Sequence, residues 1–260
     1  MYSHFFSPTL YAFSWLIGII ITMELGRRIG LRQLRKRQGK EMAGLDMIGG
    51  VVFTLCGLLI AFTLTGGASR YDTRRMLIAE EANDIGTAYL RVDLLAPADQ
   101  SAVRALFREY VDSRIAAYRK VPDLTAAAAE LRRSAQIQEK IWKQSILATR
   151  NEGAHVDAAK LLLPALNNMI DITTTRLMTA RIHPPNIIYV FLFILGLGCS
   201  LVAGIRLATT LSRRWLHIVV FAIVMSLSAY VILALEYPRY SFINLGQYDQ
   251  LLVELGESMK

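Results

Sequence analysis

Residues 47–91 read MIGGVVFTLCGLLIAFTLTGGASRYDTRRMLIAEEANDIGTAYLR, an apolar run followed directly by a polar one. Its first part, residues 47–65, carries no charge and is long enough to cross a hydrocarbon core roughly 30 Å thick. The remainder is polar but keeps a helical period, and no proline interrupts the chain from Leu45 to Leu95. The pattern predicts one helix of roughly 48 residues, about 70 Å long, that continues beyond the membrane. A simple break at Gly66-Gly67 is the alternative.

Three further apolar blocks have membrane-spanning length, at residues 10–25, 187–208 and 216–235. Basic residues follow the first block instead of preceding it, which indicates an uncleaved span and not a secretory signal. With 53% hydrophobic residues and a mean hydropathy of +0.35, the chain is predicted to be an all-α integral membrane protein. The predicted parts are spans one and two (1–67), a helical soluble insert (68–186), spans three and four (187–237) and a short C-terminal tail (238–260).

Basic residues concentrate in the two short loops between spans. They are Arg27, Arg28, Arg32, Arg35, Lys36, Arg37 and Lys40 in the first loop, and Arg206, Arg213 and Arg214 in the second. The positive-inside rule places both loops in the cytoplasm of a bacterial inner membrane, and the termini and insert outside. Arg70, Arg74 and Arg75 oppose this orientation, because they adjoin the second span within the insert. The span-end carboxylates, Glu24, Asp46 and Glu236, are interpreted as interfacial groups.

The insert is predicted to be helical throughout, in pieces at residues 68–95, 99–120, 123–150 and 154–182. Alanine, leucine, arginine and glutamate dominate it, and turn signals at Pro97, Pro122-Asp123 and Gly153 separate the pieces. Period-two alternation of apolar residues is absent, so no sheet is expected. Pro184-Pro185 ends the last piece just before the third span.

Two spans carry small residues at helical spacing. The second has Gly50, Thr54, Gly57, Ala61 and Thr65; the third has Gly196, Ser200 and Gly204. Such faces are typical of close helix packing, because small residues let backbones approach. The face on the second span is also suited to line a narrow pore if several copies of the helix surround an axis, and the sequence leaves both interpretations open.

Three carboxylates, Glu80, Glu81 and Asp84, crowd the helix beyond the second span without a basic residue three or four positions away. Either they are solvated or paired with arginines from elsewhere, for which Arg176 and Arg181 are candidates, or copies of them ring an ion path. Acidic rings favour cations and arginine rings favour anions, so Arg70, Arg74 and Arg75 are the opposite candidates. A second polar stripe, which includes Asp171, is a further candidate for the vestibule.

Enzyme chemistry, cofactors and nucleic-acid binding find no support in the sequence. Nucleotide, hydrolase and zinc-protease motifs are absent, and the four histidines are scattered. The two cysteines, Cys56 and Cys199, fall inside apolar blocks and are expected to be buried small hydrophobes. We expect a protein that is not an enzyme, with no metal or cofactor, whose partners are lipid, inorganic ions and further copies of itself.

The run LCGLLIAFTLTGGASRYDTRRMLIAEEANDIGTAYLRVDLL, residues 55–95, resembles the bestrophin-like membrane protein family of bacteria. Bestrophins proper are pentameric anion channels with four transmembrane helices per subunit, and their second helix lines the pore. The resemblance therefore implies an oligomeric ion channel. This chain departs from bestrophins in its loop charges, which favour the opposite orientation, and in having only Phe53 and Phe62 as aromatic candidates on the second span.

The leading hypothesis is a homo-oligomeric ion channel whose second span lines the pore. The alternative is a membrane-anchored sensor or scaffold whose helical insert binds a partner or ligand. A membrane enzyme that uses the carboxylates as an acid/base pair is the weakest of the three, because no nucleophile or metal cluster accompanies them.

Overall fold

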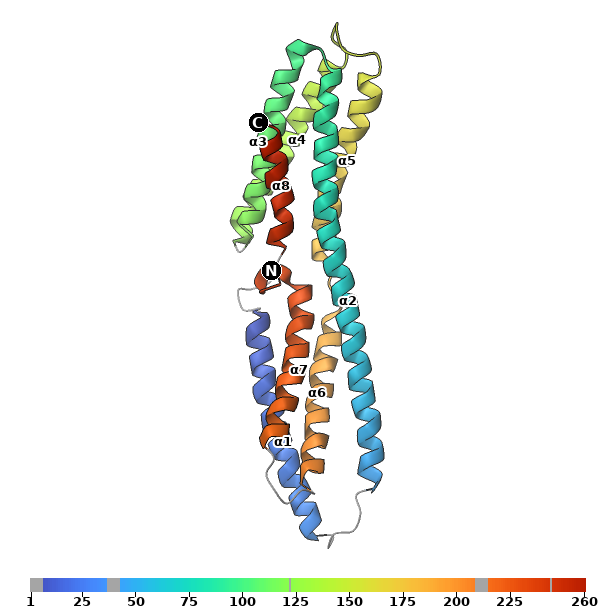
Figure 1. Cartoon of the computed structure of the whole chain (residues 1–260), viewed down its shortest axis with the longest axis vertical. Coiled ribbons are helices and arrows are strands. Elements are labelled where there is room, and N and C mark those ends of the chain that lie inside the picture. Colours follow the sequence, from blue (N-terminus) through green and yellow to red (C-terminus); the bar gives the residue numbers. More distant parts are fainter. Residues whose placement is uncertain (1–6, 37–42, 122, 209–214, 244) are drawn as a thin grey trace. The chain divides into compact units, whose positions relative to one another are not determined.

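The computed structural model describes residues 7–36, 43–121, 123–208, 215–243 and 245–260, and within these ranges the protein is helical with no strand. Figure 1 shows the elements. They are α1 (Pro8–Lys36), α2 (Ala43–Leu90), the 3-10 turn η1 (Arg91–Leu94), α3 (Pro97–Arg119), α4 (Leu124–Ala148), α5 (Ala158–Arg181), α6 (Asn186–Leu207), α7 (Trp215–Glu236), the 3-10 turn η2 (Pro238–Tyr240) and α8 (Gly246–Ser258). Four helical stretches are long and apolar enough to cross a membrane, which confirms the predicted all-α membrane fold.

Helix α2 runs unbroken through Gly66-Gly67, so the predicted continuous helix is confirmed and the break is excluded. Glycine inside a helix costs about 1 kcal/mol relative to alanine, and packing offsets that cost here. Gly67 is buried, and a β-carbon there would contact Leu235 of α7. The guanidinium of Arg70 lies over Gly66 on the following turn. The two glycines thus make room for neighbouring groups without ending the helix.

The chain divides into two compact units. Unit 1 comprises Met1–Tyr71 and His183–Ile243, and unit 2 comprises Asp72–Ile182 and Asn244–Lys260. Each unit is therefore assembled from two separated parts of the sequence. Each also has a hydrophobic core of its own.

In unit 1, α1 packs against α6 and α7, and small residues lie at its contact with α6. A β-carbon at Gly26 of α1 would collide with the carbonyl of Leu201, and one at Gly204 of α6 would collide with the carbonyl of Met23. Next to these contacts, the hydroxyls of Thr22 and Ser200 share a hydrogen bond. Close backbone approach of this kind is how helices gain packing energy in lipid, where no hydrophobic force drives them together.

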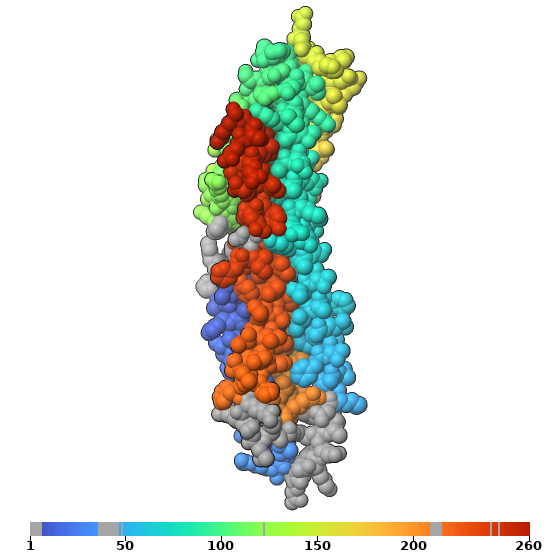
Figure 2. Space-filling view, viewed as in Figure 1, coloured from blue at the N-terminus to red at the C-terminus, as the bar shows by residue number. Residues whose placement is uncertain are grey.

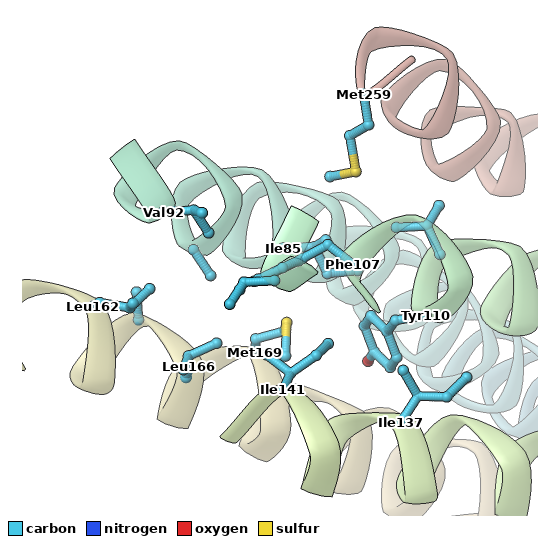
Figure 3. Close-up of a cluster of buried hydrophobic side chains, with 14 of the residues drawn as sticks. Ile85, Val92, Phe107, Tyr110, Ile137, Ile141, Leu162, Leu166, Met169 and Met259 are labelled. Atoms are coloured by element: carbon cyan, nitrogen blue, oxygen red, sulfur yellow. The ribbon is translucent and has the colours of Figure 1, made fainter. Parts of the chain in front are cut away.

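In unit 2, the second half of α2 packs with α3, α4 and α5 around a core of fully buried side chains (Figure 3). Ile85 and Val92 come from α2 and η1, Phe107 and Tyr110 from α3, and Ile141 from α4. The predicted punctuation is also found. Pro97 begins α3, and the side chain of Asp123 caps α4 by accepting from the backbone amides of Thr125 and Ala126 at 3.0 Å.

The C-terminal segment is more than the short tail that the sequence suggested. Residues Gly246–Ser258 form α8, which packs against α3 with Leu252 and Met259 buried in the core of unit 2. Figure 2 shows its side chains, in dark red, adjoining those of α2 and α3. The phenol of Tyr89 and the guanidinium of Arg108 both donate to the carbonyl of Met259. A 13-residue helix with one apolar face is too short to be stable alone, so it is held by this docking.

Candidate functional site

The predicted pore-lining face of α2 is open along its whole length. Gly50, Thr54, Gly57, Ala61 and Thr65 are all exposed in the single chain. No other part of the described chain comes within 4 Å of a β-carbon built at Gly50 or Gly57. The hydroxyl of Thr54 donates to the carbonyl of Gly50 at 2.9 Å, within its own helix. Within the described residues, this face is therefore not used for close helix packing.

The small face of α6 behaves in the opposite way. Gly196, Ser200 and Gly204 are buried, and all three contact α1. A β-carbon at Gly196 would collide with the indole ring of Trp15. The packing interpretation is correct for this helix, and the same pattern of residue types has two different environments in one molecule.

The other side of α2 faces α6 and α7. Cys56 is buried, the thiol of Cys199 lies 3.7 Å from the carbonyl of Val52, and the ring of Phe53 meets that of Phe221 edge to face at 6.2 Å. Phe53 is thus a packing residue, while Phe62 is 67% exposed. These contacts fix the rotation of α2 within unit 1 and leave the glycine/threonine face outward.

Glu81 is the centre of a buried ion-pair cluster in unit 2. Its side chain is fully buried, Oε1 accepts from Nε of Arg114 at 2.6 Å, and Oε2 accepts from Nη1 of Arg176 and from the phenol of Tyr118 at 3.3 Å. The guanidinium of Arg176 lies over the Tyr118 ring, 4.2 Å from its centre, and 4.0 Å from a carboxylate oxygen of Asp249. Two arginines and two carboxylates from α2, α3, α5 and α8 balance one another here.

Arg114 stays charged in this cluster. Burial lowers the pKa of its guanidinium, but Tyr118 and Glu81 raise it by more, so the net shift is upward. Burial of an ion pair costs several kcal/mol per ion in desolvation, which only close contacts of this kind offset. The cluster ties four helices into one arrangement.

The three neighbouring carboxylates, Glu80, Glu81 and Asp84, therefore have different environments. Glu81 is enclosed and neutralised within the chain, which corrects its assignment as a vestibule charge. Its predicted partner Arg176 is confirmed. Arg114 was missed, because its 33-residue separation from Glu81 leaves no local spacing signal. Glu80 and Asp171 are exposed and Asp84 is half-buried, and none of the three has a basic partner among the described residues.

The three arginines beyond the second span, Arg70, Arg74 and Arg75, each form an ion pair or a hydrogen bond within the chain. Arg70 pairs with Glu236 at 2.7 Å, Arg74 is buried and donates to the carbonyl of Ile182 at 3.1 Å, and Arg75 pairs with Asp72 at 3.2 Å. They do not form a free basic collar within one chain, so the structure weighs against an arginine ring.

Glu236, at the end of α7, is buried within unit 1. Its side chain is inaccessible to solvent, and Nδ1 of His183 lies 2.8 Å from its second carboxylate oxygen. Together with Arg70, these residues link α2, the segment before α6 and the end of α7 within unit 1. Within α1, Glu24 pairs with Arg27 and Arg28. The side chain of Asp46, and the basic residues Arg37, Lys40, Arg213 and Arg214, lie outside what the structure describes.

Within the described residues, no group of three or more histidine, cysteine, aspartate or glutamate side chains is placed to hold a metal ion. The polar groups gathered in unit 2 are engaged with one another, and the exposed polar face of α2 consists of hydroxyls and glycines. An exposed face of this kind is suited to contact with water, ions or another helix.

A family model described as the bestrophin-like domain matches residues 12–240. The match covers α2 through α7 and most of α1. Comparisons with curated proteins and with solved structures found no match. Since the family model accounts for most of the chain, this membrane protein belongs to the bestrophin-like family.

Proposed function

We propose that this protein is the subunit of a homo-oligomeric ion channel in which copies of α2 line the pore. The observation that carries the proposal is the open face of α2. All five residues of this face are exposed, and a β-carbon at Gly50 or Gly57 would meet no described neighbour within 4 Å, whereas the small face of α6 is packed against α1.

The small face of α2 is less apolar than the exposed surface beside it. Exposed apolar residues occupy the neighbouring surface of α2, including Val51, Leu55 and Leu58, and these suit hydrocarbon. Backbone carbonyls and hydroxyls along the small face instead suit partly dehydrated ions or a file of water. One helix cannot enclose a path, so the proposal requires several copies around an axis.

The charges support selectivity for cations. Arg70, Arg74 and Arg75 are each held by another group of the chain, and Glu81 is neutralised by two arginines. The carboxylates that remain without a basic partner among the described residues are Glu80, Asp84 and Asp171. Acidic rings raise the local concentration of cations at a pore mouth. We therefore propose these three as vestibule charges, and lipid, inorganic cations and further copies of the chain as the partners.

The proposal includes a location in a bacterial inner membrane with the two basic loops in the cytoplasm. Excess lysine and arginine in short loops resists translocation across that membrane. It also includes the absence of enzymatic activity, which the lack of nucleotide, hydrolase and zinc-protease motifs in the sequence supports.

Purified protein reconstituted in liposomes tests the channel. We expect cation flux down a gradient that Thr54→Leu combined with Ala61→Leu abolishes, because two added side chains per subunit narrow the path. The matched control, Val51→Leu, changes an equally exposed position on the apolar side of α2 and should conduct normally. Intact oligomers without flux at any voltage or gradient would contradict the proposal and favour the membrane-anchored scaffold.

A further inference from the structure

One face of α1 changes abruptly from apolar to basic. Exposed apolar side chains follow one another at helical spacing, and exposed arginines continue the same line at steps of three and four residues. The apolar members are Leu10, Phe13, Ile17, Ile21 and Leu25, and the basic members are Arg28, Arg32 and Arg35.

The rotation of this face is fixed by the opposite side of the helix. Gly26 and Gly30 are buried against α6, where β-carbons would collide with the backbone at Leu201 and Ile205. Because α1 cannot turn about its axis without losing these contacts, its apolar line stays exposed on the surface of unit 1. An exposed apolar line suits hydrocarbon, and arginines that continue it suit the depth where headgroups begin.

Two of these three arginines form no ion pair with a described residue, so they can bind an anionic ligand. Glu24 accepts hydrogen bonds from both Arg27 and Arg28, so its carboxylate is used by that pair. Arg32 and Arg35 are exposed and have no acidic partner among the residues that the structure describes.

The two available arginines border a hollow. It has a volume of about 430 Å³ and is lined by Ile29, Arg32, Gln33 and Arg35. Guanidinium groups bind phosphate oxygens through paired N–H donors, a carboxamide can donate to a further oxygen, and an isoleucine side chain suits the first carbons below a headgroup.

We propose that this hollow binds the headgroup of an anionic phospholipid, with an acyl chain along Leu25, Ile21 and Ile17. Phosphate recognition alone would also suit free phosphate, but the apolar line that leads into the hollow suits only a ligand with an acyl chain. The site lies on α1, away from the proposed pore face of α2, and it holds whether or not the protein conducts.

Native mass spectrometry of the purified full chain tests the site, using equimolar phosphatidylglycerol and phosphatidylcholine as probes. We expect the wild-type protein to retain phosphatidylglycerol preferentially. Arg32→Gln combined with Arg35→Gln should lower this preference about fivefold for each arginine, since a basic residue at the membrane surface contributes about that factor. The charge-retaining pair Arg32→Lys and Arg35→Lys should keep most of the preference.

The matched control is Arg132→Gln with Arg150→Gln, which removes two exposed arginines of unit 2. It should leave lipid retention unchanged. Equal loss in the control, or no loss in the Arg32/Arg35 variant, overturns the proposal. A final arm adds inorganic phosphate or glycerophosphoglycerol, which has no acyl chains. Displacement of phosphatidylglycerol by either at equal concentration would show a phosphate site and overturn the assignment to lipid.

Discussion

Glu81 of α2 and Arg114 of α3 form a hydrogen-bonded ion pair in which both side chains are almost fully buried. Arg176 of α5 approaches the other oxygen of the same carboxylate, so a single acidic group faces two arginines from two helices. The pair is the electrostatic centre of unit 2.

Glu81→Ala should destabilise unit 2 by about 3–5 kcal/mol, because it leaves Arg114 buried without its partner. Thermal unfolding followed by circular dichroism in detergent measures the effect. Glu80→Ala, one residue away and exposed, is the control and should change stability by no more than about 0.5 kcal/mol. Equal melting temperatures for the two variants would show that the buried pair contributes nothing.

Adjacent leucines in α8 should respond very differently to truncation. Leu252 is fully buried in the core of unit 2, so Leu252→Ala should cost about 2–5 kcal/mol. Leu251 is 37% exposed, and Leu251→Ala should cost much less. Limited proteolysis within unit 2 reports the difference, and identical digestion of the two variants would argue that α8 is not docked.

Replacing glycine by alanine should lower stability on the packed face of α6 but not at its open positions. Gly204→Ala forces a methyl group against the carbonyl of Met23 and should cost about 1–3 kcal/mol. Gly198→Ala is the control, since a β-carbon there meets no neighbour within 4 Å and alanine is the better helix former. The temperature of aggregation in detergent measures the stability of both variants. If Gly204→Ala leaves this temperature unchanged, the close approach of α1 and α6 is contradicted.

Thiol labelling distinguishes whether the exposed small face of α2 contacts water or lipid. In a background where Cys56 and Cys199 are replaced by alanine, Ala61→Cys should react with a membrane-impermeant thiol reagent, because reaction requires the thiolate and hence water. Leu55→Cys, on the apolar side, should not react. If both positions stay protected in intact oligomers, the small face is a contact between helices and not a pore lining.

Reversing the sign of the exposed acid should reverse ion preference. Glu80→Arg is expected to move the reversal potential in a salt gradient toward anion selectivity. Glu139→Arg changes another exposed carboxylate, on α4, and should leave the reversal potential unchanged. A selectivity that follows Glu139 as much as Glu80 would point to surface charge in general and not to a vestibule.

Much of the fold follows from the sequence, because length and hydropathy mark membrane spans strongly. The spans, the uninterrupted α2 and the partner Arg176 were all predicted from residue patterns. The pairing of Glu81 with Arg114 was not, since it depends on which faces of α2 and α3 meet. The same limit explains the two small faces: Gly57 and Gly204 look alike in sequence, and only the neighbouring helix makes one open and the other buried.

The docking of α8 also sets an order of events during synthesis. The core of unit 2 contains Ile85 and Leu166 from before α6 and α7, and Leu252 and Met259 from after them. A ribosome therefore delivers both apolar helices before it delivers the residues that close this core. Until then, the surface that later receives Leu252 has to stay uncovered or be shielded by a chaperone. While the ribosome synthesises the segment between α5 and α8, this uncovered apolar surface therefore favours aggregation.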